Sequence, residues 1–283
     1  MDNLIKREFK LTTPTHGRSF LADITTIEST KKLPVIVFVH GFKGFKDWGH
    51  FNLLAEKFAR MGYAFVKFNF AFNGTTLDDP HNFADLNAFG HNTFTKELAD
   101  IDTVLNHLHS QPWSDLSLDL DRLNLIGHSR GGGIGLVKAA EEQRIKKVAS
   151  WAAVHDFAMN FTDELIAQWQ KEEVFYIQNA RTGQNMPMYL GIYEDVQQNK
   201  ARLSPMNAVA QMDKPILIIH GTNDETVPLA AAQALKSTNN KAELYVIEGA
   251  DHVFGGTHPF EGNDLHPHTY DVLNKTVSFF SDN

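Results

Sequence analysis

Apolar and polar residues alternate with a period of two near the start of the chain. Ile5 and Phe9 fall on one side of this pattern, and Lys6 and Glu8 fall on the other. A turn-rich segment follows, and a second run with strand character covers residues 20–27. Alternation of this kind is typical of strands with one buried face, so we predict an N-terminal β-hairpin.

The rest of the chain alternates between short apolar runs and segments with helical periodicity. Residues 34–39 are continuously apolar, as expected for a strand buried on both faces of a parallel sheet. Further strands are predicted over residues 63–70, 122–126, 147–154, 215–220 and 243–248, and helices over 51–61, 98–108, 131–140, 230–235 and 270–280. Strands that alternate with helices predict an α/β fold, with a mostly parallel sheet covered by helices on both faces.

This alternation breaks between Val154 and Pro215. The stretch is too long for a plain loop and is rich in aromatic residues. They are Phe157, Phe161, Trp169, Phe175, Tyr176, Tyr189 and Tyr193. We therefore predict a core domain formed by residues 1–154 and 208–283, with an inserted helical cap over residues 155–207 that packs on the core.

Composition and charge narrow the classes of function. Hydrophobic residues make up 42% of the 283 residues and charged residues 21%, which is enough to bury a sizeable core. The formal net charge is -8 and basic residues are not clustered, which argues against nucleic acid or an anionic membrane as a partner. With no cysteine, disulfides, thiolate metal sites and a cysteine nucleophile are excluded.

The first ten residues lack the apolar core of a secretory signal, and no stretch is long enough to span a bilayer. We therefore expect a soluble cytoplasmic protein that acts on a small molecule. The oligomeric state stays open, with a homodimer as one option.

A serine lies in a glycine-rich turn between a predicted strand and a predicted helix. Residues Gly127-His128-Ser129-Arg130-Gly131 fit the pattern Gly-x-Ser-x-Gly. A nucleophilic serine on a strained strand-to-helix turn needs such glycines, because side chains two positions before or after it would collide with neighbouring elements. A glycine-rich helix start with a capping serine gives the same pattern, so the motif needs suitable partners.

A serine hydroxyl becomes a good nucleophile when a base takes its proton and an acid orients that base. In sheets of this type the partners follow in the order Ser, acid, His, on loops after strands. Asp224 lies in the turn after strand 215–220, and His252 lies directly after strand 243–248. We predict Ser129 as nucleophile, His252 as general base and Asp224 as the orienting acid.

Other residues compete for these roles. Glu225 adjoins Asp224, but in a Gly-x-x-Asp-x-x-x-Pro segment the aspartate is the residue presented at the turn. Three more histidines lie beyond the predicted base: His258, His266 and His268. We interpret them as surface loop residues, because a His-x-His pair without a nearby set of carboxylates is poor support for a metal site. No metal and no cofactor is predicted.

A tetrahedral oxyanion needs two aimed donors, one from the N–H after the serine and one from a loop after an earlier strand. Arg130 supplies the first backbone N–H. The loop that begins with His40 and Gly41 follows strand 34–39, so the N–H of Phe42 supplies the second. An ordinary turn after a strand is the alternative for this loop, and His40 is expected to brace it.

These residues together resemble the α/β-hydrolase superfamily, from His40-Gly41 through Ser129 and Asp224 to His252. Within it, the chain looks like prolyl-oligopeptidase-like and dienelactone-hydrolase-like enzymes, and is similar to cinnamoyl (feruloyl) esterases, whose cap is inserted at the same place. The resemblance implies the α/β-hydrolase fold and serine hydrolase activity. The serine differs from true dienelactone hydrolases, which use cysteine.

Three functions are compatible with this sequence. The first is hydrolysis of small acyl or aryl esters through an acyl-enzyme, because an aromatic-rich cap is expected to line an apolar pocket; the same aromatics can instead form the cap's own core. The second is a small peptidase or amidase, in which Glu164, Glu172 and Glu173 would hold an amino group unless they form a solvated face. The third is a binding protein on an inactive hydrolase scaffold.

Overall fold

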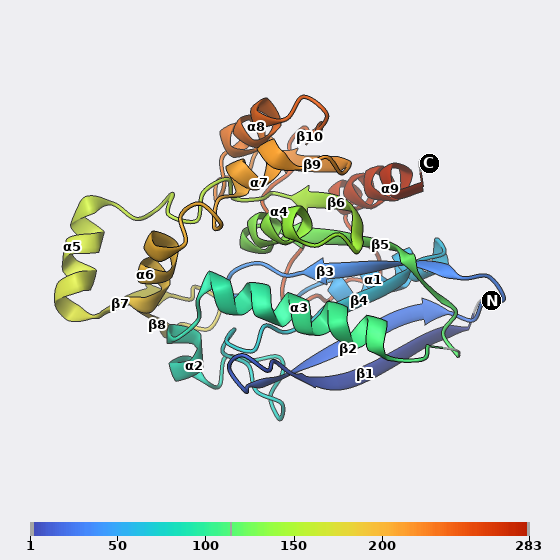
Figure 1. Ribbon diagram of the computed structural model, residues 1–283, viewed down its shortest axis with the longest axis horizontal. Coiled ribbons are helices and arrows are strands. Elements are labelled where there is room, and N and C mark those ends of the chain that lie inside the picture. Colours follow the sequence, from blue (N-terminus) through green and yellow to red (C-terminus); the bar gives the residue numbers. More distant parts are fainter. Residues whose placement is uncertain (1–2, 114, 282–283) are drawn as a thin grey trace.

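One large sheet organises the protein (Figure 1). The computed structural model describes residues 3–113 and 115–281. The eight strands lie in the order β1-β2-β4-β3-β5-β6-β9-β10. Their bounds are β1 (Leu4–Thr12), β2 (Ser19–Ile27), β3 (Leu33–Val39), β4 (Ala64–Phe68), β5 (Leu118–His128), β6 (Ile145–Trp151), β9 (Ile216–Gly221) and β10 (Glu243–Ile247).

The direction of the strands confirms the predicted sheet. β1 pairs antiparallel with β2, and β2 pairs antiparallel with β4. The other neighbouring strands are parallel, from β4 across to β10. The N-terminal hairpin therefore forms one edge of a mostly parallel sheet. The carboxyl ends of the parallel strands meet at one edge, where loops from distant parts of the chain come together.

Helices cover both faces of the sheet, as the alternating pattern predicts (Figure 1). On one face lie α3 (Phe94–Ser110), α4 (Arg130–Glu141) and α8 (Leu229–Thr238), and on the other lie α1 (Phe51–Arg60) and α9 (Pro267–Ser281). In α3 the apolar residues Leu98, Ile101 and Leu105 are fully buried. The side chain of Thr93 accepts a hydrogen bond from the Lys96 N–H and so caps the start of this helix.

The stretch between β6 and β9 contains helices and a small hairpin. Its elements are α5 (Asp163–Glu172), β7 (Val174–Gln178), β8 (Asn185–Tyr189), α6 (Gly191–Gln198) and α7 (Pro205–Gln211). β7 and β8 form a separate antiparallel sheet, which the sequence pattern did not predict. The helix α7 continues across residue 207, the predicted end of the cap. The buried Trp169 ties α5 to the hairpin, because its Nε1 donates to the Met188 carbonyl at 2.8 Å.

The hairpin β7–β8 rests on a short helix of the main part, α2 (Leu86–Gly90), which was also not predicted. The Tyr189 ring lies so close to Gly90 that a Cβ at Gly90 would come within 2.7 Å of it. The Tyr189 hydroxyl also donates to Asn87 Oδ1 at 3.2 Å. The inserted stretch is therefore packed against the main part beside the carboxyl edge of the sheet (Figure 1).

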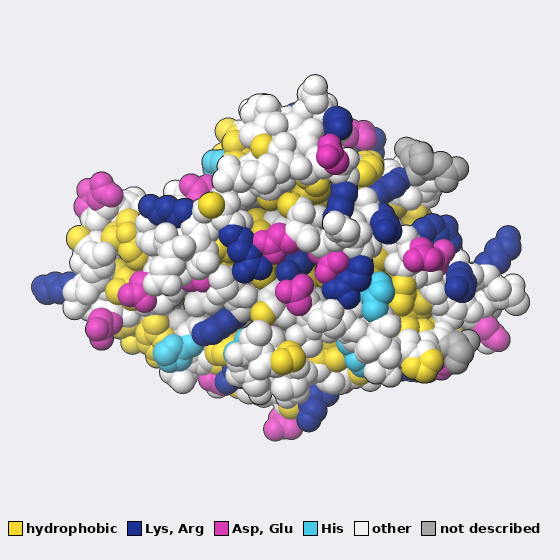
Figure 2. All heavy atoms as spheres, viewed as in Figure 1, with side chains coloured by type: hydrophobic (Ala, Val, Ile, Leu, Met, Phe, Trp, Pro, Cys, Tyr) yellow, Lys and Arg dark blue, Asp and Glu magenta, His cyan; other side chains and the backbone are white. Residues whose placement is uncertain are grey.

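Basic and acidic side chains are interspersed on the face of the molecule that carries α3 and α4 (Figure 2). Lys138 on α4 pairs with Asp102 on α3 at 2.7 Å, and Arg202 pairs with Glu141 at 2.6 Å. Lys138 is buried, whereas Arg202 and Glu141 are partly exposed, and exposed pairs contribute little to stability, about 0 to 1 kcal/mol each. Within the part of the chain that the structure describes, no helix is long and apolar enough to cross a membrane.

Candidate active site

Ser129 lies at the sharp turn between β5 and α4. Its backbone has φ of 58°, a left-handed conformation that is strained for a residue with a Cβ. A Cβ on Gly127 would come within 2.2 Å of the Gly131 carbonyl, and one on Gly131 within 2.3 Å of the His40 carbonyl. Glycine at both positions is therefore required for this turn. The Ser129 N–H donates to the Trp151 carbonyl at 2.8 Å, which fixes the turn against β6.

The structure brings the three predicted residues into one hydrogen-bonded chain. His252 Nε2 lies 2.9 Å from Ser129 Oγ, and His252 Nδ1 lies 2.8 Å from Asp224 Oδ2. Because Asp224 is an acceptor, Nδ1 carries a proton and Nε2 is left to accept the serine proton. The three residues come from the loops after β5, β9 and β10, which meet at the carboxyl edge of the sheet.

The carboxylate of Asp224 is completely buried but well supplied with donors. Its Oδ1 accepts from the N–H groups of Thr226 and Val227 at 2.9 and 2.8 Å, and its Oδ2 contacts both His252 and His220. Burial favours the neutral acid, but hydrogen bonds from His220, His252 and the Val227 N–H outweigh it and hold the pKa of Asp224 well below its ordinary value. Asp224 is therefore ionised at neutral pH.

The rival residues lie elsewhere. Glu225 is exposed. His258 Nδ1 accepts from the Gly49 N–H at 2.8 Å, and His266 Nδ1 accepts from the His268 N–H at 3.2 Å. Among the described residues no group of three metal-ligating side chains is arranged to hold an ion.

Two buried histidines hold the loops around the serine. His128 Nε2 donates to the His252 carbonyl at 2.8 Å, and His40 contacts the Gly41 carbonyl at 2.9 Å and the Phe70 N–H at 3.3 Å. Burial lowers the pKa of His128 to about 3, helped by the nearby His252 ring, and burial lowers the pKa of His40 to about 4. Both rings are therefore neutral at neutral pH.

The loop after β3 passes directly beside the serine. A Cβ on Gly41 would lie 3.0 Å from the Ser129 Cβ, so the backbone of this loop approaches closely. Within residues 3–113 and 115–281, the N–H groups of Phe42 and Arg130 donate no hydrogen bond to another protein group. The Arg130 guanidinium lies 4.9 Å from the Phe42 ring centre and is paired with the buried Glu97.

A cavity of about 400 Å³ opens at Ser129 beneath the inserted stretch. Its lining is dominated by aromatic and aliphatic side chains, contributed by the main part and by the insertion. They include Phe42, Phe94, Val154, Phe157, Phe161, Leu165, Trp169, Phe175, Ile177, Met188 and Ile192. Several of these aromatics also pack on each other, such as Phe161 edge-on to Trp169. Of the aromatics that the sequence left open between pocket and core, four line the cavity, namely Phe157, Phe161, Trp169 and Phe175, whereas Tyr176, Tyr189 and Tyr193 do not.

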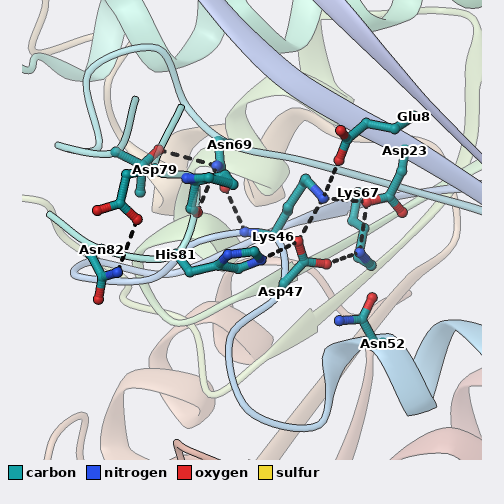
Figure 3. Close-up of polar contacts among 12 residues, drawn as sticks. Glu8, Asp23, Lys46, Asp47, Asn52, Lys67, Asn69, Asp79, His81 and Asn82 are labelled. Atoms are coloured by element: carbon teal, nitrogen blue, oxygen red, sulfur yellow. Dashed lines mark hydrogen bonds and ion pairs between the residues drawn. The ribbon is translucent and has the colours of Figure 1, made fainter. Parts of the chain in front are cut away.

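The loop that carries Phe42 is anchored farther along by a cluster of buried charges, which we call the Lys–Asp network (Figure 3). It consists of Asp23 on β2, Lys46 and Asp47 after β3, and Lys67 on β4. Lys46 Nζ lies 2.7 Å from Asp23 and 2.6 Å from Asp47, and Lys67 Nζ lies 2.8 Å from Asp23. No role for Asp47 was predicted from the sequence, and the structure shows that its contacts with Lys46 and Lys67 fix this loop to the sheet.

Sequence reasoning missed His220, Glu97 and the Lys–Asp network as parts of the site's surroundings. For His220 the available signal was its position as a polar residue at the end of the apolar run over residues 215–219. Glu97 lies on a helix whose periodicity marks its position as part of the buried stripe, yet nothing local indicates Arg130 as its partner. These contacts join residues far apart in the chain.

Comparisons with known proteins agree with this architecture. The BD-FAE family profile matches residues 23–238, about three quarters of the chain. A putative carboxymethylenebutenolidase of Escherichia coli (strain K12) is 23% identical over 237 residues, which cover 80% of this chain and 69% of that protein. The uncharacterized peptidase YuxL of Bacillus subtilis (strain 168) is 27% identical over 176 residues, which cover 56% of this chain but 23% of that much longer protein.

A solved structure with a similar fold is Est1E from Butyrivibrio proteoclasticus. It has a TM-score of 0.67 and 18% sequence identity, and the match covers 96% of each chain. At this identity the likeness shows the fold alone, whereas the family profile shows membership. The chain belongs to the BD-FAE family and is an esterase-like enzyme with the α/β-hydrolase fold.

Proposed function

We propose that the protein hydrolyses carboxylic esters of small acyl or aryl acids, with Ser129 as the nucleophile. The observation that carries this proposal is that the hydrogen-bonded chain of Asp224, His252 and Ser129 ends at an apolar cavity of about 400 Å³. A pocket of this size and lining suits an uncharged acyl group better than a polar one.

In the first half of the reaction, Ser129 Oγ attacks the ester carbonyl carbon while His252 Nε2 takes the hydroxyl proton. The negative charge on the carbonyl oxygen is stabilised by the N–H groups of Phe42 and Arg130, which are free to donate. His252 then gives its proton to the leaving alkoxide oxygen, the ester C–O bond breaks, and an acyl group stays on Ser129.

In the second half, His252 takes a proton from water and the water oxygen attacks the acyl carbon. The bond to Ser129 Oγ then breaks as His252 returns the proton to the serine, and the carboxylic acid is released. Asp224 keeps its charge throughout and stabilises the imidazolium.

The aromatic lining of the cavity supports the binding of aryl groups as well as acyl groups. A structure of Est1E with bound ferulic acid has the same fold, with a TM-score of 0.65 and 19% identity. In this chain Phe94 stacks on Phe157 with ring centres 4.3 Å apart, so the cavity offers flat aromatic walls. Aromatic rings favour such surroundings through offset-stacked and edge-to-face contacts.

The peptidase alternative has less support. Glu164, Glu172 and Glu173, which would hold a free amino group, are exposed and do not line the cavity among the described residues. Comparing amino-acyl anilides with simple esters of the same acid tests this alternative directly, and faster turnover of the anilides would favour it.

The central test is hydrolysis of p-nitrophenyl acetate, butyrate and cinnamate by the purified protein and by the variant Ser129→Ala. We expect hydrolysis by the parent and a loss of about 10⁴-fold or more in the variant. Ser150→Ala is a matched control, because Ser150 is a buried serine on the neighbouring strand β6 whose hydroxyl has no partner among the described residues. Absence of hydrolysis of every ester, or equal loss in both variants, would overturn the proposal.

A further inference from the structure

His220 is a buried histidine on the far side of Asp224 from His252. It lies near the end of β9 and its side chain is completely buried. Its Nε2 lies 2.7 Å from the Val227 carbonyl and 3.2 Å from Asp224 Oδ2. The same oxygen of Asp224 accepts the hydrogen bond from His252 Nδ1 at 2.8 Å. One carboxylate oxygen is therefore shared by two imidazole rings.

The contacts of His220 determine which of its nitrogens carries the proton. The Val227 carbonyl can accept but not donate, so Nε2 of His220 must be the N–H donor. Its Nδ1 is buried and has no hydrogen-bond partner among the described residues. His220 Nε2–H thus donates to the Val227 carbonyl and also lies next to Asp224 Oδ2.

We propose that His220 is a positioning residue for the Ser129–His252–Asp224 chain: it withdraws charge from Asp224 Oδ2 and fixes the carboxylate in the plane that His252 requires. This inference rests on the ester hydrolysis proposed above. By also binding the Val227 carbonyl, His220 closes the turn from Asp224 to Val227, and Val227 itself lines the cavity. The position of the acid and the wall of the cavity are therefore set by one ring.

Other polar groups near this pair come from neighbouring elements. His128, the last residue of β5, faces His252 and contacts its carbonyl rather than its ring nitrogens. The N–H groups of Thr226 and Val227 bind the other oxygen of Asp224. His220 is thus the single side chain besides His252, among the described residues, that donates to Asp224 Oδ2.

The removal of this donor has a defined consequence. Without the His220 N–H, more negative charge stays on Asp224 Oδ2, and the protonated form of His252 is stabilised more strongly. Protonation of the base then begins at a higher pH, so the acid limb of kcat/KM moves to higher pH. A residue that merely fills space would leave this limb where it is.

The experiment compares His220→Gln with His220→Asn. The amide nitrogen of glutamine is as many bonds from the backbone as Nε2 of histidine, so it can reach Asp224; that of asparagine is one bond shorter. We expect the asparagine variant to lose about tenfold to a hundredfold in kcat with KM little changed, and its acid limb to move to higher pH. The glutamine variant should keep kcat within about threefold of the parent, and the acid limb of its kcat/KM profile should stay at the same pH.

Melting temperatures and fluorophosphonate labelling of Ser129 separate the possible failures. If the parent shows no hydrolysis that depends on Ser129, the proposed function is wrong. If the parent hydrolyses esters and the two folded variants have equal kcat and the same acid limb as the parent, the role of His220 is wrong and the proposed function stands. If His220→Asn does not fold, His220→Gln still decides: a displaced acid limb or a large loss of kcat in this variant contradicts the proposal.

Discussion

Two buried clusters of ionisable groups lie close to the same loop, but they are built in opposite ways. In the Lys–Asp network two lysines and two aspartates pair with one another, Lys46 also pairs with the half-exposed Glu8, and Lys46 and Lys67 are at most 2% exposed. In the chain Asp224–His252–Ser129 one carboxylate faces a neutral imidazole and a hydroxyl, and the far end opens onto a cavity. The charges of the first cluster are fixed in ion pairs, whereas the groups of the second cluster are arranged so that a proton can be transferred between them.

The difference shows that buried charge alone does not identify an active site. In the network, burial favours the neutral forms. The attraction of opposite charges outweighs burial at Asp47, whose pKa lies below its ordinary range, and at Lys46, whose pKa lies above it, whereas burial lowers the pKa of Lys67. No base is left to accept a substrate's proton. The cavity, and an Nε2 of His252 that accepts from the Ser129 hydroxyl, are what distinguish the proposed catalytic cluster.

The largest expected effect of a change in either cluster is on turnover. Asp224→Asn removes the charge that stabilises the imidazolium and favours the wrong ring tautomer, so we expect kcat to fall by about 10⁴-fold. The measurement is kcat on p-nitrophenyl butyrate, with the melting temperature as a check on folding. Glu225→Gln, at the exposed neighbour, should leave kcat unchanged. A loss in Glu225→Gln that equals the loss in Asp224→Asn would contradict the assignment of the acid.

A change in the network should act on stability instead. Lys67→Met leaves Asp23 and Asp47 buried with one lysine between them, and uncompensated buried charge costs about 3 to 5 kcal/mol. We expect this loss in the free energy of unfolding, measured by urea denaturation. The activity of the folded fraction should fall far less than with Asp224→Asn.

The matched control is Lys241→Met, because Lys241 pairs with Asp213 on the surface, where the two side chains are 68% and 96% exposed. An exposed pair contributes about 0 to 1 kcal/mol, so this variant should remain close to the parent in stability. Equal destabilisation by the two substitutions would show that the network contributes no more than a surface pair.

The meeting of Ser129, His252 and Asp224 was predictable from the sequence because each of these residues has a local signal. The elbow needs glycines two residues on either side of Ser129, and the acid and the base follow apolar runs that read as strands. Parallel strands bring their carboxyl ends to one edge, so the chain order of the three residues implies their meeting in space. The predicted fold, including the N-terminal hairpin, is confirmed by the strand order.

The network and His220 have no comparable signal. Asp23 and Lys67 are 44 residues apart in the sequence. Each one alone has the pattern of a polar residue on the solvent-exposed face of a strand. Their burial follows from the pairing of β2 with β4 and from the loop that covers them, which no local pattern encodes. The hairpin β7–β8 was missed for a related reason, since five-residue strands give too few repeats to separate from helix.

The last expected effect is on the pH dependence of stability, and it belongs to the histidines rather than to the network. Burial lowers the pKa of His40 and His50 to about 4 and that of His128 to about 3. In the unfolded chain they take up protons near pH 6.5, so between about pH 6.5 and 4 the unfolded state binds more protons. The free energy of unfolding is therefore highest above this window and falls as the pH is lowered.

Each of these histidines contributes a slope of up to about 1.4 kcal/mol per pH unit, measured as urea denaturation at intervals from pH 7.5 to 4.5. Replacing one of them, as in His50→Gln, should reduce the slope by that amount even if the variant is less stable at pH 7.5. Asp47 and Lys46 keep their charges across the window, so Lys67→Met should lower the whole curve more than it changes its slope. A slope unchanged in His50→Gln but abolished in Lys67→Met would reverse this assignment, because the titrating groups would then lie in the network.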